Sequence, residues 1–190
     1  WQDYRIVQQH NGIRDPNAIR AGTILRIPRR LLRIEPVPAK VASLRGKVTI
    51  DGRPAGVNSP VRAGETISTG AISFTTVELA DKTVVTVPSN SRLEVLSLGR
   101  IMLTGAVERR FLLRDGRVDA EVKPLRRKQD GFDIQTPVSV ASVRGTRFRV
   151  TYQDRTGLAG ASVLEGAVAM ASGGEDLLIT GGKGVAISQQ

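Results

Sequence analysis

From residue 41 onward the chain alternates hydrophobic and polar residues in short runs, which are separated by Gly, Pro, Asn and Asp. Alternation with a period of two is typical of strands with one buried face, and the separating residues favour turns. The sequence shows no long helical period after residue 40. The pattern predicts an all-β body with strands at 41–50, 74–79, 84–87, 92–96, 111–114, 116–122, 132–135, 146–152, 161–164, 167–171 and 185–188.

One phrase occurs three times, as "ASLRGKVTIDG" from residue 42, "ASVRGTRFRVTYQD" from residue 141 and "ASVLEGAVAMASGG" from residue 161. Each copy predicts a strand, a break at Gly or Glu-Gly, a second strand and a polar turn. The last two copies start twenty residues apart, a spacing that suits successive rungs of a β-solenoid. The first copy could cap that stack or close a sandwich against it. We therefore predict a mainly β fold, either a β-solenoid or a sandwich of short strands.

The first 33 residues differ in kind from the rest. Apolar spacing predicts a short helix that ends at Asn11-Gly12, followed by the turn-forming "RDPNAIRAG" and a strand in "TILRIP". Two prolines in "RIEPVPAK" keep the next segment extended, which is typical of a linker. We predict a partial α/β unit at 1–33, a linker at 34–40 and the β-domain at 41–190.

The net charge of +10 is concentrated in two regions. Residues 1–47 hold ten Lys or Arg against three acids, and residues 100–130 hold nine against five. Nucleic acid is a disfavoured partner, because aromatic residues are only 4% and neither a helix-turn-helix nor an RRM-like pattern is present. The same charge would attract anionic envelope polymers or lipid headgroups.

The composition argues against catalysis and cofactors. The chain has no cysteine and a single histidine, His10, at the predicted helix end. The glycine-rich "GGEDLLITGGKG" lacks the strand and helix of a phosphate loop, so β-turns are the expected structure there. We expect no catalytic residues, no metal, no cofactor and, since no apolar run reaches ~20 residues, no transmembrane helix in this chain.

Two basic features are candidate binding sites. The turn "KPLRRKQDG" could anchor anionic polymers, or it could be a solvated hairpin tip; its cations are Lys123, Arg126, Arg127 and Lys128. Arg144, in the second copy of the repeated phrase, could pair with a carboxylate of a partner. A structural role is favoured, in which its guanidinium binds backbone carbonyls near Gly145 or an acid such as Asp133.

The N-terminal segment resembles the C-terminal half of a LysM domain over about residues 1–30. The run "HNGIRDPNAIRAGTILRIP" carries the pattern at Asn11, Asp15, Pro16, Ile19, Gly22, Leu25, Ile27 and Pro28. A complete LysM domain has a first strand, a Gly-Asp-Thr turn and a first helix ahead of this point. The resemblance implies binding of peptidoglycan or another N-acetylglucosamine polymer, with contacts from Asn11, Ile13, Asp15 and Asn17.

A second resemblance covers about 41–188. The stretch "GETISTGAISFTTVELADKTVVTVPSNSRLEV" and the later "RDGRVDAEV" and "FDIQTPVSVASVRGTRFRV" are similar to FecR-type periplasmic domains. The signature residues are Thr136, Pro137, Arg144, Gly145, Thr146 and Phe148, whereas Glu65 and Lys82 replace the usual Asp and Gly. The resemblance implies an extracytoplasmic β-rich domain. Its best-known members are inner-membrane regulators that relay an outer-membrane transport signal to a sigma factor.

Taken together, these resemblances predict a non-enzymatic protein of the bacterial periplasm. The leading hypothesis is a cell-envelope scaffold that binds peptidoglycan through the LysM-like unit and an unknown envelope protein through the FecR-like domain. The alternative is a signal-transducing module, in which the FecR-like domain binds a protein partner through a strand edge or an arginine-rich face.

Overall fold

The computed structural model describes residues 3–125 and 127–188. The N-terminal segment holds α1 (Asp3–His10) and the short 3₁₀ helices η1 (Pro16–Ala18) and η2 (Arg29–Leu31). All other elements are strands: β1 (Ile34–Pro36), β2 (Ala39–Arg45), β3 (Val48–Ile50), β4 (Arg53–Pro54), β5 (Thr66–Thr69), β6 (Phe74–Leu79), β7 (Val84–Val87), β8 (Arg92–Ile101), β9 (Val107–Glu121), β10 (Gly131–Gln135), β11 (Val140–Val143), β12 (Arg147–Gln153), β13 (Leu158–Glu165), β14 (Ala167–Ser172), β15 (Glu175–Thr180) and β16 (Gly184–Ile187). The expected mainly β fold is confirmed.

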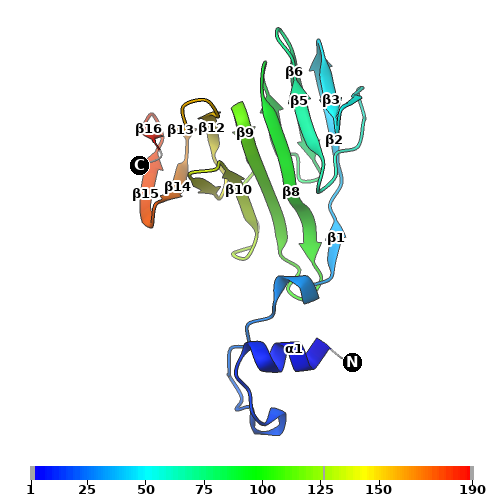
Figure 1. Ribbon diagram of the computed structural model, residues 1–190, viewed down its shortest axis with the longest axis vertical. Helices are drawn as coiled ribbons and strands as arrows, with labels where there is room; N and C mark the ends of the chain where they lie inside the picture. Colours follow the sequence, from blue (N-terminus) through cyan, green and yellow to red (C-terminus); the bar gives the residue numbers. More distant parts are fainter. Residues whose placement is uncertain (1–2, 126, 189–190) are drawn as a thin grey trace.

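The strands form one open sheet that divides into two halves at the long strand β9 (Figure 1). The first half-sheet has the order β15-β14-β11-β10-β9-β8-β5-β3-β4, with β1 on the far end of β8. The second has the order β2-β6-β7-β9-β12-β13-β16. The N-terminal part of β9 pairs with β8 and β10, and its C-terminal part pairs with β7 and β12. A single strand thus belongs to both halves.

The inner faces of the two halves enclose one hydrophobic core. Burial alternates along the strands, as in β6 and β7, so that every second residue points inward. Phe132 lies at its centre, with its ring centroid 5.5 Å from that of Phe111 and 6.2 Å from that of Phe148. Such tilted and edge-to-face contacts add to the burial of the rings themselves.

The three copies of the repeated phrase are corners at which the chain crosses between the half-sheets. The first copy joins β2 to β3, the second joins β11 to β12, and the third joins β13 to β14. The second and third copies lie side by side but run antiparallel, because β12 pairs with β13 and β11 with β14 in that sense. Solenoid rungs would stack in parallel. The solenoid prediction is therefore wrong, and the sandwich alternative describes the molecule.

Several segments differ from the expected elements. The predicted linker at 34–40 contributes β1, whose residues Ile34–Pro36 pair with Ile101–Gly99 of β8. Proline kept this segment extended, as predicted, but an extended segment can also complete a sheet edge. The segment "EDLLIT", expected as turns, is the strand β15 and pairs with β14 along its whole length. Its glycines flank the strand and do not interrupt it.

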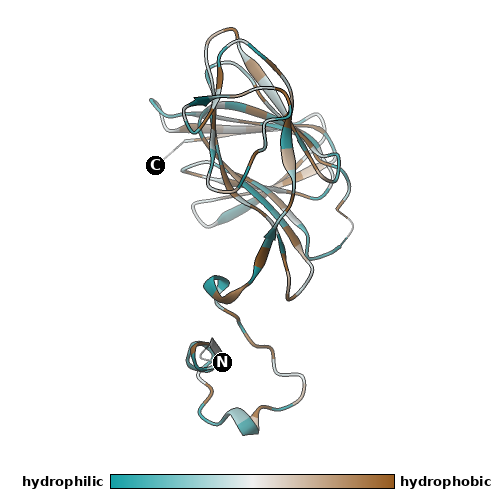
Figure 2. Ribbon diagram, turned by 90° about the vertical axis from the view of Figure 1, so that its right-hand side faces the viewer, coloured by the Kyte–Doolittle hydropathy of each residue, from teal (hydrophilic) through white to brown (hydrophobic). Residues whose placement is uncertain are grey.

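The N-terminal segment extends away from the β body, as Figures 1 and 2 show. The helix α1 ends at His10, and Gly12 follows with a φ of +63°, in accord with the predicted stop. The strand expected in "TILRIP" is wrong, because the described residues offer this segment no pairing strand; Ile24 is 89% exposed. A strand is stable only where a neighbouring strand pairs with its backbone N–H and C=O groups.

Candidate functional site

The signature residues of the resemblance have structural roles in the turns and corners. The Thr136 hydroxyl oxygen accepts a hydrogen bond from the backbone N–H of Ser139 (3.0 Å) and closes the buried turn between β10 and β11. The Thr146 hydroxyl donates to the carbonyl of Ala167 (2.9 Å), which ties the second corner to the third. Phe148 is buried in the core. The signature therefore specifies how the chain turns, and it does not gather into a cleft.

Gly46 and Gly145 show why the repeated phrase needs glycine. Both have positive φ, +75° and +106°, which side chains of L-residues disfavour. A Cβ on Gly145 would lie 2.9 Å from the Cα of Pro124, and one on Gly46 would lie 2.4 Å from the hydroxyl of Ser73. Lys82, which replaces the usual Gly of the resemblance, also has a positive φ, of +67°. The family's glycine at this turn thus matches the backbone found here.

Arg144 fastens the basic turn to the corner. Its guanidinium donates to the carbonyls of Lys128 (2.7 Å) and Arg127 (2.9 Å). The alternative partner, Asp133, instead accepts a hydrogen bond from the hydroxyl of Ser142 (2.7 Å). These contacts favour the structural role for Arg144, with the carbonyls supplied by the basic turn.

The basic turn itself is only partly a cationic cluster. Lys123 pairs with Glu121 (2.8 Å), and this hydrogen bond and the ammonium charge lower the pKa of the Glu121 carboxyl. Arg127 donates to the carbonyl of Gly105 (3.1 Å), while Lys128 is exposed. Arg126 lies outside the described residues. Of the three described cations, Lys123 and Arg127 are thus engaged with groups of this chain.

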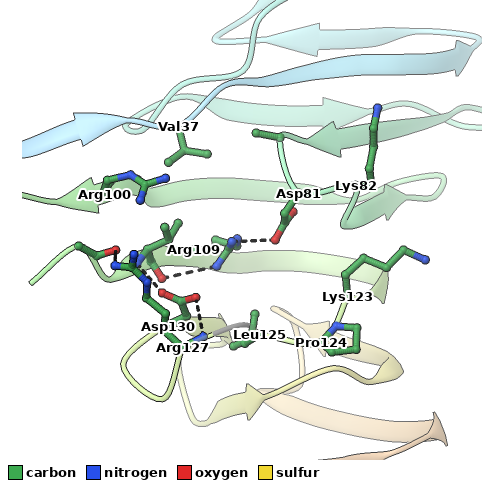
Figure 3. A pocket seen from close by; sticks show the side chains of 13 residues that line it. Val37, Asp81, Lys82, Arg100, Arg109, Lys123, Pro124, Leu125, Arg127 and Asp130 are labelled. Carbon is green, nitrogen blue, oxygen red and sulfur yellow. Dashed lines mark hydrogen bonds and ion pairs between the residues drawn. The ribbon is translucent and has the colours of Figure 1, made fainter.

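Lys123 and Arg127 line a pocket of about 640 Å³ (Figure 3). Arg109 lies at its centre, and its guanidinium pairs with the carboxylate of Asp81 at 2.7 Å. Asp130 also faces the pocket, where its carboxylate accepts the backbone N–H of Val107 (3.0 Å). Arg109 was not among the predicted site residues, although a signal exists: it occupies an inward position in the alternating run of β9.

The predicted glycan-binding residues lie on the N-terminal loop. The Asn11 amide staples this loop, since it donates to the carbonyl of Arg26 and accepts the N–H of Arg26, both at 2.7 Å. The Asp15 carboxylate caps η1 through the N–H of Asn17 (2.9 Å). The side chains of Asn11 and Asp15 are therefore engaged locally, while Asn17 is exposed and Ile13 is half-buried.

The C-terminal side of the molecule presents an open sheet edge. Within residues 3–125 and 127–188 the strand β15 pairs only with β14, and it carries Leu177 and Leu178 at 48% and 68% exposure. Two other edges are blunted: β4 has two residues and contains Pro54, and residues 58–61 cover β2 through hydrogen bonds such as Val61 N–H to Ala39 (2.9 Å). Among the described residues β16 also pairs on one side only, with β13, but its apolar residues Val185 and Ile187 are half-buried, unlike the exposed leucines of β15. Unprotected edges with apolar side chains are the places where another strand can add.

A metal site or a membrane-spanning helix in the described part of the chain would also bear on function. There, no group of three or more His, Cys, Asp or Glu side chains is arranged to hold a metal ion. Among the helices that the structure describes, none has the length and apolar character to cross a membrane.

The fold and these sites can now be compared with known proteins. The family described as FecR protein matches residues 65–169, more than half of the chain, and the chain therefore belongs to this family. The match starts after the N-terminal segment and does not bear on the LysM resemblance. A search among curated proteins finds no match.

Two solved structures share the fold. Both are crystal structures of a "putative anti-sigma factor" from Parabacteroides distasonis, with TM-scores of 0.54 and 0.53. Each is 19% identical to this chain, and the match covers 65% of this chain and 54% of the other. The chain thus spans about half the length of these structures.

Proposed function

We propose that this protein is a regulatory module without catalytic activity, which binds a protein partner in an extracytoplasmic signalling pathway. Membership of the FecR family and the fold shared with an anti-sigma factor support the regulatory class. The observation that carries the binding mode is the open edge of β15. This choice favours the signalling alternative over the scaffold hypothesis.

The partner contributes an extended segment that adds to β15 as a further strand. Backbone hydrogen bonds to the free edge supply affinity, and side chains set the register. Leu177 and Leu178 would pack against apolar residues of the added strand. Glu175 and Asp176 lie on the same edge in a chain with a net charge of +10, so they form a local acidic site. The complementary segment is therefore apolar with one or two basic residues at the end that meets Glu175 and Asp176.

The test compares transcription in strains of the source organism that carry Leu178→Lys, Leu103→Lys or a deletion of the gene. Leu103 is the matched control, because it is 64% exposed and lies in the turn between β8 and β9, away from β15. RNA sequencing should show that Leu178→Lys and the deletion change the same transcripts. Leu103→Lys should resemble the wild type.

Two results would contradict the proposal in different ways. A deletion strain with unchanged transcription would overturn the regulatory role itself. A Leu178→Lys strain that behaves like the wild type would overturn the edge as the binding surface. Sedimentation of the purified chain adds a third check, because dimers that Leu178→Lys dissociates would assign the edge to a second copy of this chain.

The N-terminal segment supports a second proposal, that residues 1–33 bind peptidoglycan through the loop of Asn11, Ile13, Asp15 and Asn17. The Asn11 staple supports this, since it holds the loop in one conformation before any ligand arrives. Peptidoglycan sacculi should retain the whole chain at moderate salt and lose the chain that begins at residue 34. Retention that moderate salt abolishes would instead indicate attraction by charge alone.

We also propose the boundary between the two units at residues 33 and 34. The segment at 34–40 then belongs to the β body and does not act as a free linker, because β1 pairs with β8.

A further inference from the structure

A charged side chain occupies a core position in β9. Burial alternates along this strand, and Val107, Arg109, Phe111 and Leu113 all point inward. Arg109 is 5% exposed, so nearly all of its guanidinium is removed from bulk water. A buried charge is costly unless ion pairs and hydrogen bonds compensate it.

The ion pairs and hydrogen bonds of the buried Arg109 do not use all of its donors. Its guanidinium pairs with Asp81 at 2.7 Å, and its other terminal nitrogen lies 3.5 Å from the carbonyl oxygen of Val107, the limit of a hydrogen bond. The buried Nε has no hydrogen-bond partner among the described residues. An arginine carries five N–H donors in a fixed planar fork, which suits the binding of two oxygens of one anion. Arg109 lines the pocket and therefore has a guanidinium whose hydrogen-bonding capacity is not fully used by the described residues.

The surroundings of Arg109 are strongly cationic. The pocket is lined by five cationic side chains and two carboxylates; the cations are Lys82, Arg100, Arg109, Lys123 and Arg127. Both carboxylates are engaged, Asp81 by Arg109 and Asp130 by the backbone N–H groups of Val107 and Arg127. Lys82 pairs with Glu78 outside the pocket, but its side chain is 72% exposed, and such pairs exchange readily.

The pocket is too large for a single ion. Its volume of about 640 Å³ is in the range of sites for small organic molecules. Apolar side chains also line it: Figure 3 shows Val37 on one side of Arg109 and Pro124 and Leu125 on the other. Apolar side chains among several cations would suit a carbon skeleton that carries more than one anionic group.

We propose that this pocket binds a small organic polyanion, with two or more phosphate or carboxylate groups held by Arg109, Arg100 and Arg127. Arg109 contacts one anionic group at the base of the pocket, and Arg100 and Arg127 contact a second nearer the rim. The site lies apart from the β15 edge and is independent of the partner proposed for that edge.

Isothermal titration calorimetry at 150 mM NaCl would test the site, with tripolyphosphate and citrate as probes on the whole chain. Arg100→Gln removes a rim cation that is exposed and therefore not needed for folding. Arg155→Gln is the matched control, since this exposed arginine does not line the pocket and the change in net charge is the same. We expect Arg100→Gln to weaken binding about tenfold or more, as for a lost charged hydrogen bond, and Arg155→Gln to leave binding within about twofold.

A double variant, Arg109→Leu with Asp81→Asn, removes the buried pair without leaving one charge unpaired. This variant should bind neither probe, while its circular dichroism spectrum matches that of the wild type. If the variant does not fold, the comparison of Arg100→Gln with Arg155→Gln tests the site. Binding of one probe alone would assign the site to phosphates or to carboxylates. Failure of both probes to bind the wild type, or equal weakening by Arg100→Gln and Arg155→Gln, would overturn the proposal.

Discussion

Gly145 sets the corner between β11 and β12 through its backbone geometry. With a φ of +106° and Pro124 only 2.9 Å from the position of a Cβ, alanine would be strained and would overlap the chain. We expect Gly145→Ala to lower the free energy of unfolding by about 2–4 kcal/mol. Urea denaturation measures this change.

Gly131→Ala is the control for this prediction, because Gly131 lacks a positive φ and a Cβ there would meet nothing within 4 Å. Its effect should stay within about 0.5 kcal/mol. Equal stability changes in the two variants would show that the corner adapts, and that the glycine of the signature is not required by the backbone.

The burial of a single residue can be predicted where apolar and polar residues alternate along its strand. Phe74, Phe111, Phe132 and Phe148 all fall in alternating runs that predict burial. Three of them are buried in the core, whereas Phe74, the first residue of β6, is 39% exposed and its predicted burial is wrong. Arg109 was missed because the expected strand began at residue 111, two residues after it. Extending the same alternation backward from Phe111 places Arg109 on the inward face, where a charge marks a candidate site.

At the scale of elements, β1 attaches the N-terminal segment to the β body. Gly99 of β8 permits this contact, because a Cβ at that position would lie 2.3 Å from Ile34 and 2.9 Å from the carbonyl of Glu35. We expect Gly99→Ala to displace β1 while the rest of the sheet stays folded. Limited trypsin digestion should then cleave after Arg29, Arg30 or Arg33 about tenfold faster than in the wild type.

The same digestion of Gly131→Ala provides the control. Unchanged cleavage in Gly99→Ala would mean that β1 shifts without detaching. Faster cleavage throughout the β body would mean that Gly99 supports the whole sheet, and would contradict a local role for β1.

The bounds of a strand can be predicted where turn-forming residues lie at both of its ends. The strands at 74–79 and 84–87 agree with β6 and β7 because turn residues flank clean alternation. In place of β9 the sequence predicts two strands, at 111–114 and 116–122, because Asp115-Gly116 is typical of a turn. Here Gly116 bends a continuous strand from one half-sheet into the other. The strand β15 was missed because its acidic start and flanking glycines suggest turns.

The order of strands is a property of the whole molecule that local patterns do not contain. The strands β9 and β10 pair in parallel, although the other pairs in both half-sheets are antiparallel among the described residues. Repetition showed that three segments are alike, but their role as corners depends on which strands they join. Prediction of that role needs contacts between residues far apart in sequence.

The N-terminal segment and the β body should be energetically separate. All buried hydrophobic residues in the described chain lie at or after Ala39, so the segment before β1 contributes nothing to the core. Its contacts with the β body include a polar one, in which Arg29 pairs with Glu108 and donates to Ser97 (3.0 Å). An eight-residue helix without buried support is not stable alone in water.

We therefore expect the chain that begins at residue 34 to unfold within about 2 °C of the whole chain in differential scanning calorimetry. A peptide of residues 1–33 should show little helical signal in circular dichroism. Arg29→Ala in the whole chain controls for the polar contact and should change the melting temperature by a similar small amount. A loss of more than about 5 °C on truncation would mean that the segment packs on the β body, and that the two units fold as one.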